Sequence, residues 1–505
     1  MRRVLLISLV TLLLVLTVSS VVVAKRNYIV VGTTDKITSL DPAKQYDYLS
    51  TNVLQNVLVG LVNYKPGTAE LVPWLAEKWD VSADGLVYTF YLKKGVKFTD
   101  GADCDANALK FSFDRAMKLG GDPSFLLTDI VKKVDVVDKY TAKVTLKYPF
   151  GAFVAVVGYT VAYPVSPKIF PANDFYLGTP PADGPYKIKQ WIHDVRVILE
   201  RNDSYFGTPA KTKRIVLNFY QTASTLRLAL ESGEIDVAYR TLNPRDVQDL
   251  EKNPHFKVYK GPSPFIRHIV FNVKKAPFDN AKIRKAIALA VDRSAIINDI
   301  LAGQAAPLYT LIPIGWWGHK DVMPKRNVAE AVKILEGIGY SKSNPLKITL
   351  WYTPSHYGST EADIAQVLAS NIEETGVVKV KIKYAEWATY IDYWEHGIMG
   401  MFLLGWYPDY IDPDDYMWPF LASSASPSMG SYYSNPKVDT LLKQARKISD
   451  VAKRSELYKE VQDILGEEAP YVDLYEGIQI CVTKPDIKGV LLEPTQIFRY
   501  YLLYR

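Results

Sequence analysis

Residues 75–101 read LAEKWDVSADGLVYTFYLKKGVKFTDG, a closely spaced set of turn residues and aromatic side chains. Ser82–Gly85 predicts a turn between two strands, with the glycine at a position that suits a positive φ. The segment Leu86–Leu92 that follows alternates in the manner of a half-buried strand. Two more turns are predicted at Lys93–Gly95 and Asp100–Gly101. We therefore expect this stretch to build a small subdomain and to carry no catalytic group.

Outside this stretch, apolar periodicity predicts strands that alternate with helices. Strands are expected at residues 28–32, 140–146, 214–219, 235–238, 267–273, 347–352 and 378–384. Helices are expected at residues 106–119, 224–231, 280–292, 361–375, 437–448 and 454–466. Strands separated by helices of this length indicate parallel sheets in an α/β architecture.

The composition bounds the class of protein. The chain has 505 residues, of which 48% are hydrophobic and 23% charged, so it is globular and long enough for about three domains. These values exclude a disordered, collagenous or polytopic membrane protein. The net charge of +6 is spread over the whole length, whereas nucleic-acid binding needs a concentrated basic face. We therefore expect no nucleic-acid partner.

The N-terminus predicts export. Arg2 and Arg3 precede the apolar run Val4–Ala24, which ends in Val22-Val23-Ala24, the small-residue pattern of a signal-peptidase site. Residues 1–24 are thus expected to be a signal peptide, and the protein to be periplasmic or associated with the cell surface. An uncleaved anchor is the alternative, because the run is about as long as the roughly 20 residues that span a bilayer.

Catalytic and metal-binding motifs are missing from the sequence. The six histidines contain no pair at i, i+3 or i+4, and the common zinc-protease, hydrolase and phosphate-binding motifs are absent. Cys104 and Cys481 are expected to be separate buried thiols, although export permits a disulfide. The four aspartates between residues 409 and 415 suggest either a glycosidase pair or a turn-forming acidic loop. We expect no metal, no cofactor and no enzyme activity.

The stretch 75–101 resembles the signature of family 5 extracellular solute-binding proteins, the peptide, nickel and oligosaccharide group that serves ABC importers. The resemblance continues in family order at residues 184–186, 202–207, 231–236, 271–293, 433–439 and 469–470. It implies an α/β, two-lobed periplasmic-binding-protein-like fold, with an extra subdomain in lobe one and a hinge of two crossing strands. A ligand held in the cleft would be enclosed as the lobes close about this hinge.

The resemblance also implies a division of the chain. Lobe I is expected to contain residues 25–56, 168–262 and 477–505. The extra subdomain is expected at residues 57–167, and lobe II at residues 263–476. Pro262-Ser263-Pro264 suits the first crossing, because prolines limit the freedom of the backbone beside a strand.

The predicted ligand site follows an apolar strand at 399–404 and reads Gly405-Trp406-Tyr407-Pro408-Asp409-Tyr410-Ile411-Asp412-Pro413. In peptide-binding members a similar Trp-x-x-Asp motif supplies a carboxylate to the ammonium group of the peptide, and this role transfers to Asp409. Main-chain groups of Gly405 and Tyr407 are expected to pair with an extended ligand. The predicted ligand-binding residues also include Trp406, Tyr410 and His356. The alternative is that Trp406 belongs to the core and that Asp409 caps the next turn.

One departure from the family pattern bears on the ligand. Dipeptide-binding members place an Arg after the strand that matches residues 347–352, where it holds the ligand carboxylate. Here residues 353–358 read TPSHYG, without Arg or Lys, and a neutral His356 is a poor carboxylate clamp. This departure favours a longer peptide or a ligand that has no carboxylate.

An oligopeptide is therefore the expected ligand, and ABC permease subunits are the expected partners of a monomeric binding protein. An oligosaccharide is the closest alternative, because seven of the ten tryptophans lie in the predicted lobe II and aromatic faces suit sugar rings. An exported hydrolase and a sensor or chaperone-like protein without a transporter are more distant alternatives.

Overall fold

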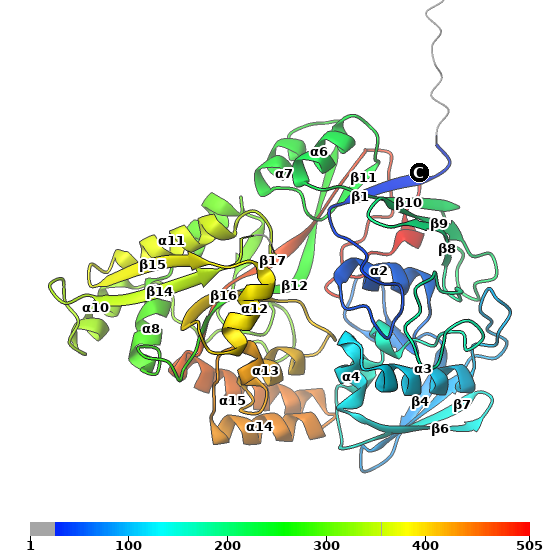
Figure 1. Cartoon of the computed structure of the whole chain (residues 1–505), viewed down its shortest axis with the longest axis horizontal. Helices are drawn as coiled ribbons and strands as arrows, with labels where there is room; N and C mark the ends of the chain where they lie inside the picture. Colours follow the sequence, from blue (N-terminus) through cyan, green and yellow to red (C-terminus); the bar gives the residue numbers. More distant parts are fainter. Residues whose placement is uncertain (1–25, 355) are drawn as a thin grey trace, which may run out of the picture.

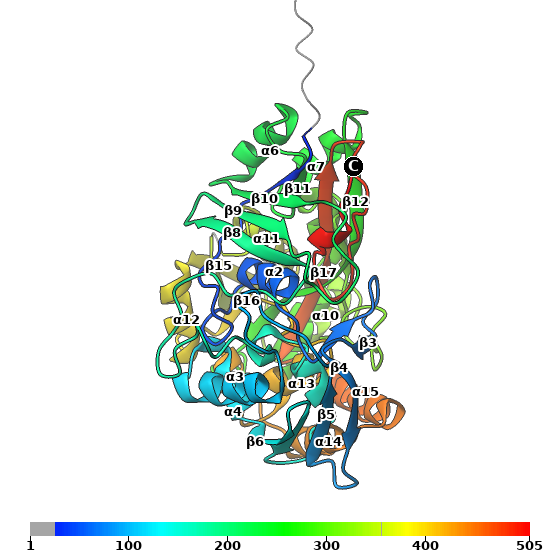
Figure 2. The same cartoon turned by 90° about the vertical axis from the view of Figure 1, so that its right-hand side faces the viewer.

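The computed structural model describes residues 26–354 and 356–505, so the predicted signal peptide lies outside the described residues. The protein is a mixed α/β molecule of two lobes, which are joined by the long strands β12 (Lys257–Phe271) and β17 (Tyr471–Thr483) (Figure 1). Figure 2 shows the same two strands side by side. The predicted two-lobed fold with two crossing strands is confirmed. In the described part of the chain, no helix is long and apolar enough to cross a membrane.

The two crossing strands pair antiparallel, from Lys257 opposite Thr483 to Val270 opposite Tyr471. The register breaks between Pro262 and Ile266, because proline has no main-chain N–H to donate to the ladder. Before the break β17 also pairs with a strand of lobe I, and after it β12 also pairs with a strand of lobe II. The ladder is thus least regular where the chain passes between the lobes.

Eleven strands of the described chain form one sheet that continues through both lobes. In lobe I, β17 is followed by β11 (Val237–Tyr239), β1 (Ile29–Thr33), β10 (Arg214–Phe219), β9 (Arg196–Arg201) and β8 (Tyr186–Ile192). β1 is buried along its whole length and lies parallel to both neighbours, as expected of an apolar strand that has helices on both faces. Val30 packs with α6 (Ala223–Glu231) and α7 (Pro244–Glu251), and Ile29 and Val31 pack with α2 (Tyr48–Val57).

In lobe II, β12 is followed by β16 (Met401–Trp406), β14 (Leu346–Tyr352) and β15 (Val378–Tyr384), while β13 (Ala305–Pro307) pairs with β17. The side chains of β16 alternate between two cores: Met401 and Leu403 pack into one, and Phe402 and Leu404 into the other. The first core is covered by α8 (Ala281–Ala290), α10 (Val328–Glu336) and α11 (Glu361–Glu373). The second is covered by α12 (Trp387–Glu395), α13 (Asp414–Leu421), α14 (Pro436–Lys447) and α15 (Val451–Glu468).

The stretch 75–101 contributes to a separate four-stranded antiparallel sheet beside lobe I. The strand order is β4 (Ala76–Val81), β5 (Val87–Leu92), β7 (Thr141–Leu146) and β6 (Val131–Asp138). The predicted turn is present: Gly85 has a φ of 69°, and its main-chain N–H donates to the carbonyl of Ser82 at 2.8 Å. The same region contains the pair β2 (Val62–Tyr64) and β3 (Leu71–Pro73) and the helices α3 (Ala106–Leu119), α4 (Phe125–Thr128) and α5 (Phe153–Val156).

The prediction of parallel sheets is only partly right. The helix-separated strands β1, β10 and β11 pair parallel, and so do β14, β15 and β16. In contrast, β8, β9 and β10 pair antiparallel, because β8 and β9 form a hairpin. β12 and β17 are antiparallel because the chain enters lobe II along one and leaves along the other. The prediction of two separate buried thiols, Cys104 and Cys481, is confirmed.

The lobes also touch away from the crossing strands. The main-chain N–H of Gly151, beside the small sheet, donates to the carbonyl of Arg446 in lobe II at 2.7 Å. A Cβ at Gly151 would lie only 2.0 Å from the carbonyl oxygen of Ile448, so this approach requires glycine. The guanidinium of Arg446 lies 4.9 Å from the ring centre of Phe150. The region beside the small sheet and lobe II are thus in direct contact.

Two aspartates of the acidic loop hold lobe II together. Asp412 accepts two hydrogen bonds from Arg454, at 2.6 and 2.8 Å, and both side chains are at most 9% exposed. Asp414 accepts hydrogen bonds from Arg446 at 2.9 and 3.0 Å. These ion pairs connect the start of α13 to α14 and α15, so their carboxylates are structural.

We predict that Asp412→Asn lowers the free energy of unfolding by about 3 kcal/mol, because it leaves a buried guanidinium without its counter-charge. Asp463→Asn is the matched control. Asp463 pairs with Lys320 at the surface, and losing such a pair lowers the free energy of unfolding by about 1 kcal/mol or less. Urea denaturation followed by circular dichroism measures both. Equal effects of the two substitutions would contradict a structural role for Asp412.

Candidate functional site

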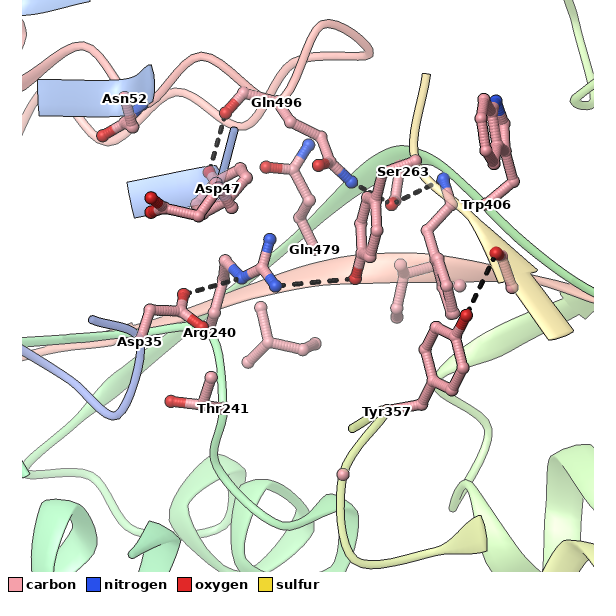
Figure 3. Close-up of a pocket in the computed structure, with 18 of the residues that line it drawn as sticks. Asp35, Asp47, Asn52, Arg240, Thr241, Ser263, Tyr357, Trp406, Gln479 and Gln496 are labelled. Atoms are coloured by element: carbon pink, nitrogen blue, oxygen red, sulfur yellow. Dashed lines mark hydrogen bonds and ion pairs between the residues drawn. The ribbon is translucent and has the colours of Figure 1, made fainter. Parts of the chain in front are cut away.

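A cavity of about 1230 Å³ lies between the lobes, beside the break in the β12–β17 ladder. Its wall includes the start of α2, the residues that follow β11, Ser263 and Phe265 of β12, the end of β16 with the loop that follows, and residues 477–480 of β17. Figure 3 shows polar and aromatic side chains from these segments facing one another. A space of this size exceeds that of a typical pocket for a small ligand, about 300–1,000 Å³.

The six predicted ligand-binding residues all line this cavity: Gly405, Trp406, Tyr407, Asp409, Tyr410 and His356. In contrast, Asp412, Asp414 and Asp415 are not among the described residues that line it. A Cβ at Gly405 would come within 2.7 Å of the ring of Phe265, so glycine lets the aromatic wall approach the backbone. The carbonyl of Gly405 already accepts a hydrogen bond from the hydroxyl of Tyr357 at 3.3 Å, which leaves less main chain for an added strand.

Asp409 presents a carboxylate to the cavity without a basic partner among the described residues. Its Oδ1 accepts a hydrogen bond from the hydroxyl of Tyr46, across the cavity in lobe I, at 2.7 Å. The protein packed around Asp409 desolvates its carboxylate and raises its pKa to about 7. Charge on this group is therefore costly in the empty cavity, and a cation that entered would stabilise it.

The loop after β16 is capped by Asp415, not by Asp409. Oδ2 of Asp415 accepts hydrogen bonds from the main-chain N–H of Asp409 at 2.8 Å and from the indole N–H of Trp406 at 3.2 Å. Burial, followed by the neighbouring Asp409, raises the pKa of Asp415 well above its usual range. The alternative in which Asp409 caps the turn is thus wrong. Trp406 belongs both to the cavity wall and to the core: it lines the cavity and packs edge-on against Phe420.

His356 lies on the lobe II side of the cavity, where its ring stacks on Trp387 with 3.5 Å between the ring centres. Burial, followed by the positive charge of Arg267, lowers the pKa of His356 to about 4. The imidazole is therefore neutral at pH 7, and it provides a flat wall and not a positive charge.

The tryptophans of lobe II do not form a stacking surface in the cavity. Of the seven, only Trp406 is among the described residues that line it. The other six pack against the second core of lobe II: Trp316, Trp317, Trp351, Trp387, Trp394 and Trp418. Their concentration in one lobe reflects the packing of its core. Besides Trp406 and His356, the aromatic part of the cavity wall consists of Phe265 and eight tyrosines.

The sequence reasoning missed Arg240, which lies in the cavity wall directly after β11. Its guanidinium lies over the ring of Tyr48, 3.9 Å from the ring centre, and 3.3 Å from a carboxylate oxygen of Asp35 (Figure 3). The sequence did hold a signal for this residue. Ligands of open α/β sheets bind beyond the carboxyl ends of the strands, and Arg240 directly follows the predicted strand 235–238.

Several contacts join the lobes across this site. Besides the bond from Tyr46 to Asp409, Arg240 reaches the hydroxyl of Tyr407 at 3.5 Å, and Ser359 donates to the side-chain oxygen of Asn243 at 3.2 Å. The side-chain amide of Gln304 in lobe II also donates to the carbonyl of Pro244 in lobe I at 2.7 Å. The described residues contain no group of three or more His, Cys, Asp or Glu side chains that could hold a metal ion. The arrangement is suited to enclosing a polar, charged ligand between two lobes.

Comparison with known proteins identifies the family. Residues 70–428 match the family model described as bacterial extracellular solute-binding proteins, family 5 Middle. The chain is 31% identical over 497 residues to the glutathione-binding protein GsiB of Pectobacterium atrosepticum, covering 95% of this chain and 94% of the relative. It is 29% identical over 466 residues to the dipeptide-binding protein of Escherichia coli, covering 86% of each chain.

A solved structure agrees with this result. The ABC transporter-associated periplasmic binding protein DppA from Helicobacter pylori, in complex with the peptide STSA, superposes with a TM-score of 0.81 at 28% identity, covering 94% of this chain and 98% of that one. The chain therefore belongs to the family 5 extracellular solute-binding proteins of ABC importers, and it is a binding protein and not an enzyme.

Proposed function

We propose that this protein captures peptides outside the cytoplasm, in the cavity between its lobes, and presents them to the membrane permease of an ABC importer. The observation that carries the proposal is the carboxylate of Asp409, which faces the cavity with no cationic partner among the described residues. A peptide ammonium supplies both the positive charge and the hydrogen-bond donors that this carboxylate lacks. Peptidic ligands named for the relatives, a dipeptide, glutathione and the peptide STSA, support the same class.

The rest of the proposal takes up the expectations from the sequence. The protein is exported by its N-terminal segment, acts as a monomer, and consists of lobe I, the subdomain at 57–167 and lobe II with the boundaries given above. Closing the lobes over a ligand requires that the ligand interacts more favourably with the closed form than with the open form. Asp409 and Tyr46 come from different lobes, so a ligand bound to both favours closure.

We predict that Asp409→Asn weakens the binding of the tripeptide Ala-Ala-Ala by about 10- to 100-fold, the equivalent of a lost charge-assisted hydrogen bond. N-acetyl-Ala-Ala-Ala has no ammonium group, so it should bind both proteins weakly and equally. Isothermal titration calorimetry on the two proteins and two peptides measures this. Asp463→Asn, at the surface, is the control and should bind both peptides as the unaltered protein does.

Two results would contradict this prediction. If Asp409→Asn bound Ala-Ala-Ala as tightly as the unaltered protein, Asp409 would not be the ammonium site. If no alanine peptide of two to five residues bound and an oligosaccharide such as maltotriose or cellotriose did, the peptide proposal itself would be wrong.

We also predict that affinity for Ala-Ala-Ala falls as the pH is lowered through 7. Desolvation raises the pKa of Asp409 to about 7, so at lower pH the carboxyl is neutral and must lose a proton before it pairs with the ammonium group. Well below that pKa, the dissociation constant should rise by roughly tenfold per pH unit. Calorimetry between pH 5 and 7.5 measures the slope. The same slope in Asp409→Asn would assign the dependence to another group.

A further inference from the structure

The cavity contains one guanidinium that the structure leaves largely without hydrogen-bond partners. We propose that Arg240 binds the terminal carboxylate of the peptide, and that the site therefore selects short peptides with both ends free. This inference rests on the peptide function proposed above and adds the second end of the ligand to it.

The backbone places Arg240 in an unusual conformation. Arg240 and Thr241 have φ values of 60° and 56°, a left-handed region that side chains other than glycine seldom occupy. Such residues persist where the surrounding contacts hold them, and they concentrate at ligand sites. Here the main-chain N–H of Arg240 donates to the carbonyl of Ile480 at 3.0 Å, and the hydroxyl of Thr241 accepts from the N–H of Thr34 at 3.2 Å.

Aromatic stacking holds the side chain of Arg240 without using its N–H groups. The guanidinium carbon lies 3.9 Å from the ring centre of Tyr48 in lobe I and 5.4 Å from that of Tyr407 in lobe II. The hydroxyl of Tyr48 in turn donates to the carbonyl of Gln496 at 2.7 Å, which fixes the ring. A stacked, immobilised guanidinium loses little further freedom when a carboxylate binds it.

The donors of Arg240 are mostly unused. A guanidinium has five N–H donors. In the described chain Arg240 donates one long hydrogen bond, to the hydroxyl of Tyr407 at 3.5 Å, and its guanidinium also interacts with the hydroxyl of Tyr48. Its ion pair with Asp35 is a single contact of 3.3 Å. In comparison, buried Arg115 binds both carboxylate oxygens of Asp41 and two main-chain carbonyls. Arg240 is thus able to accept a carboxylate in bidentate geometry.

The charges of the cavity wall leave a ligand carboxylate one place to bind. The described lining residues carry the carboxylates Asp35, Asp47 and Asp409, and Arg240 is the one Lys or Arg among them. Asp47 is occupied as the N-cap of α2, where it accepts from the N–H of Ser50 at 2.8 Å. Residues 353–358 contain no Arg or Lys to hold a ligand carboxylate, and Arg240 of the opposite lobe takes over that role.

The two charged groups lie on one short part of the wall. Tyr407, which contacts Arg240, stands two positions before Asp409. Tyr46 and Tyr48, also two positions apart, contact Asp409 and Arg240 respectively. A peptide that binds both groups by its ends is therefore only a few residues long. The proposal thus differs from the expectation from the sequence, which favoured longer peptides or ligands without a carboxylate.

The test compares Ala-Ala-Ala with its C-terminal amide on two variants. Arg240→Gln removes the charge in the cavity, and Arg245→Gln makes the same change at an exposed position of α7 outside it. By calorimetry, the unaltered protein and Arg245→Gln should bind the acid about 10- to 100-fold more tightly than the amide. Arg240→Gln should lose this preference and bind the amide as the unaltered protein does. Arg240→Lys should retain part of it, because lysine keeps the charge but not the fork of donors.

Three outcomes would overturn the inference. If the unaltered protein bound acid and amide equally while still requiring the ammonium group, Arg240 would not hold the carboxylate and the peptide function would stand. If Arg240→Gln weakened acid and amide by the same factor, its role would be structural. If no alanine peptide of two to five residues bound to the unaltered protein, as acid or as amide, the inference and the peptide function would both be wrong.

Discussion

The antiparallel pairing of β12 with β17 carries one sheet through both lobes, and the position of the ligand cavity depends on it. On one side of the pair the strands of lobe I add to β17, and on the other side the strands of lobe II add to β12. The prolines at 262 and 264 interrupt the ladder between these regions, because they cannot donate to it. The cavity lies beside this interruption, where Ser263 and Phe265 reach its wall. The least regular part of the sheet thus lies beside the cavity, at the crossing between the lobes.

The cavity holds the carboxylate of Asp409, which has no cationic partner among the described residues, and the guanidinium of Arg240, whose ion pair with Asp35 is a single contact. Some buried carboxylates elsewhere in the molecule are matched with arginines, as Asp412 is with Arg454 and Asp41 with Arg115. Asp409 instead has a tyrosine hydroxyl as its partner, and its raised pKa expresses the cost of a desolvated carboxylate. Arg240 keeps most of its donors free. A ligand with an ammonium group and a carboxylate pairs with Asp409 and Arg240 respectively. Because the two residues come from opposite lobes, such a ligand also favours the closed form.

Local patterns predicted the local structure well. The turn at Ser82–Gly85, the alternation of β5 and the helices of both lobes follow from residues close together in sequence. The crossing of the two strands was expected from the family resemblance alone. Local patterns could not predict the antiparallel pairing, because β12 and β17 lie some 200 residues apart and no local period encodes it. The partners of single side chains were equally hidden: the tryptophans of lobe II belong to its core, and Arg240 enters the cavity only because distant segments meet there. The Trp-x-x-Asp motif named a loop that lines the cavity, while the capping role fell to Asp415.

A crystal structure of the protein with Ala-Ala-Ala bound tests the central claim, that the cavity recognises a peptide by its terminal ammonium and carboxylate groups. The account predicts the ammonium nitrogen about 2.7–2.9 Å from a carboxylate oxygen of Asp409, and the carboxylate paired with the guanidinium of Arg240. A tripeptide bound in the reverse direction, or bound elsewhere while Tyr46 remained the partner of Asp409, would contradict it.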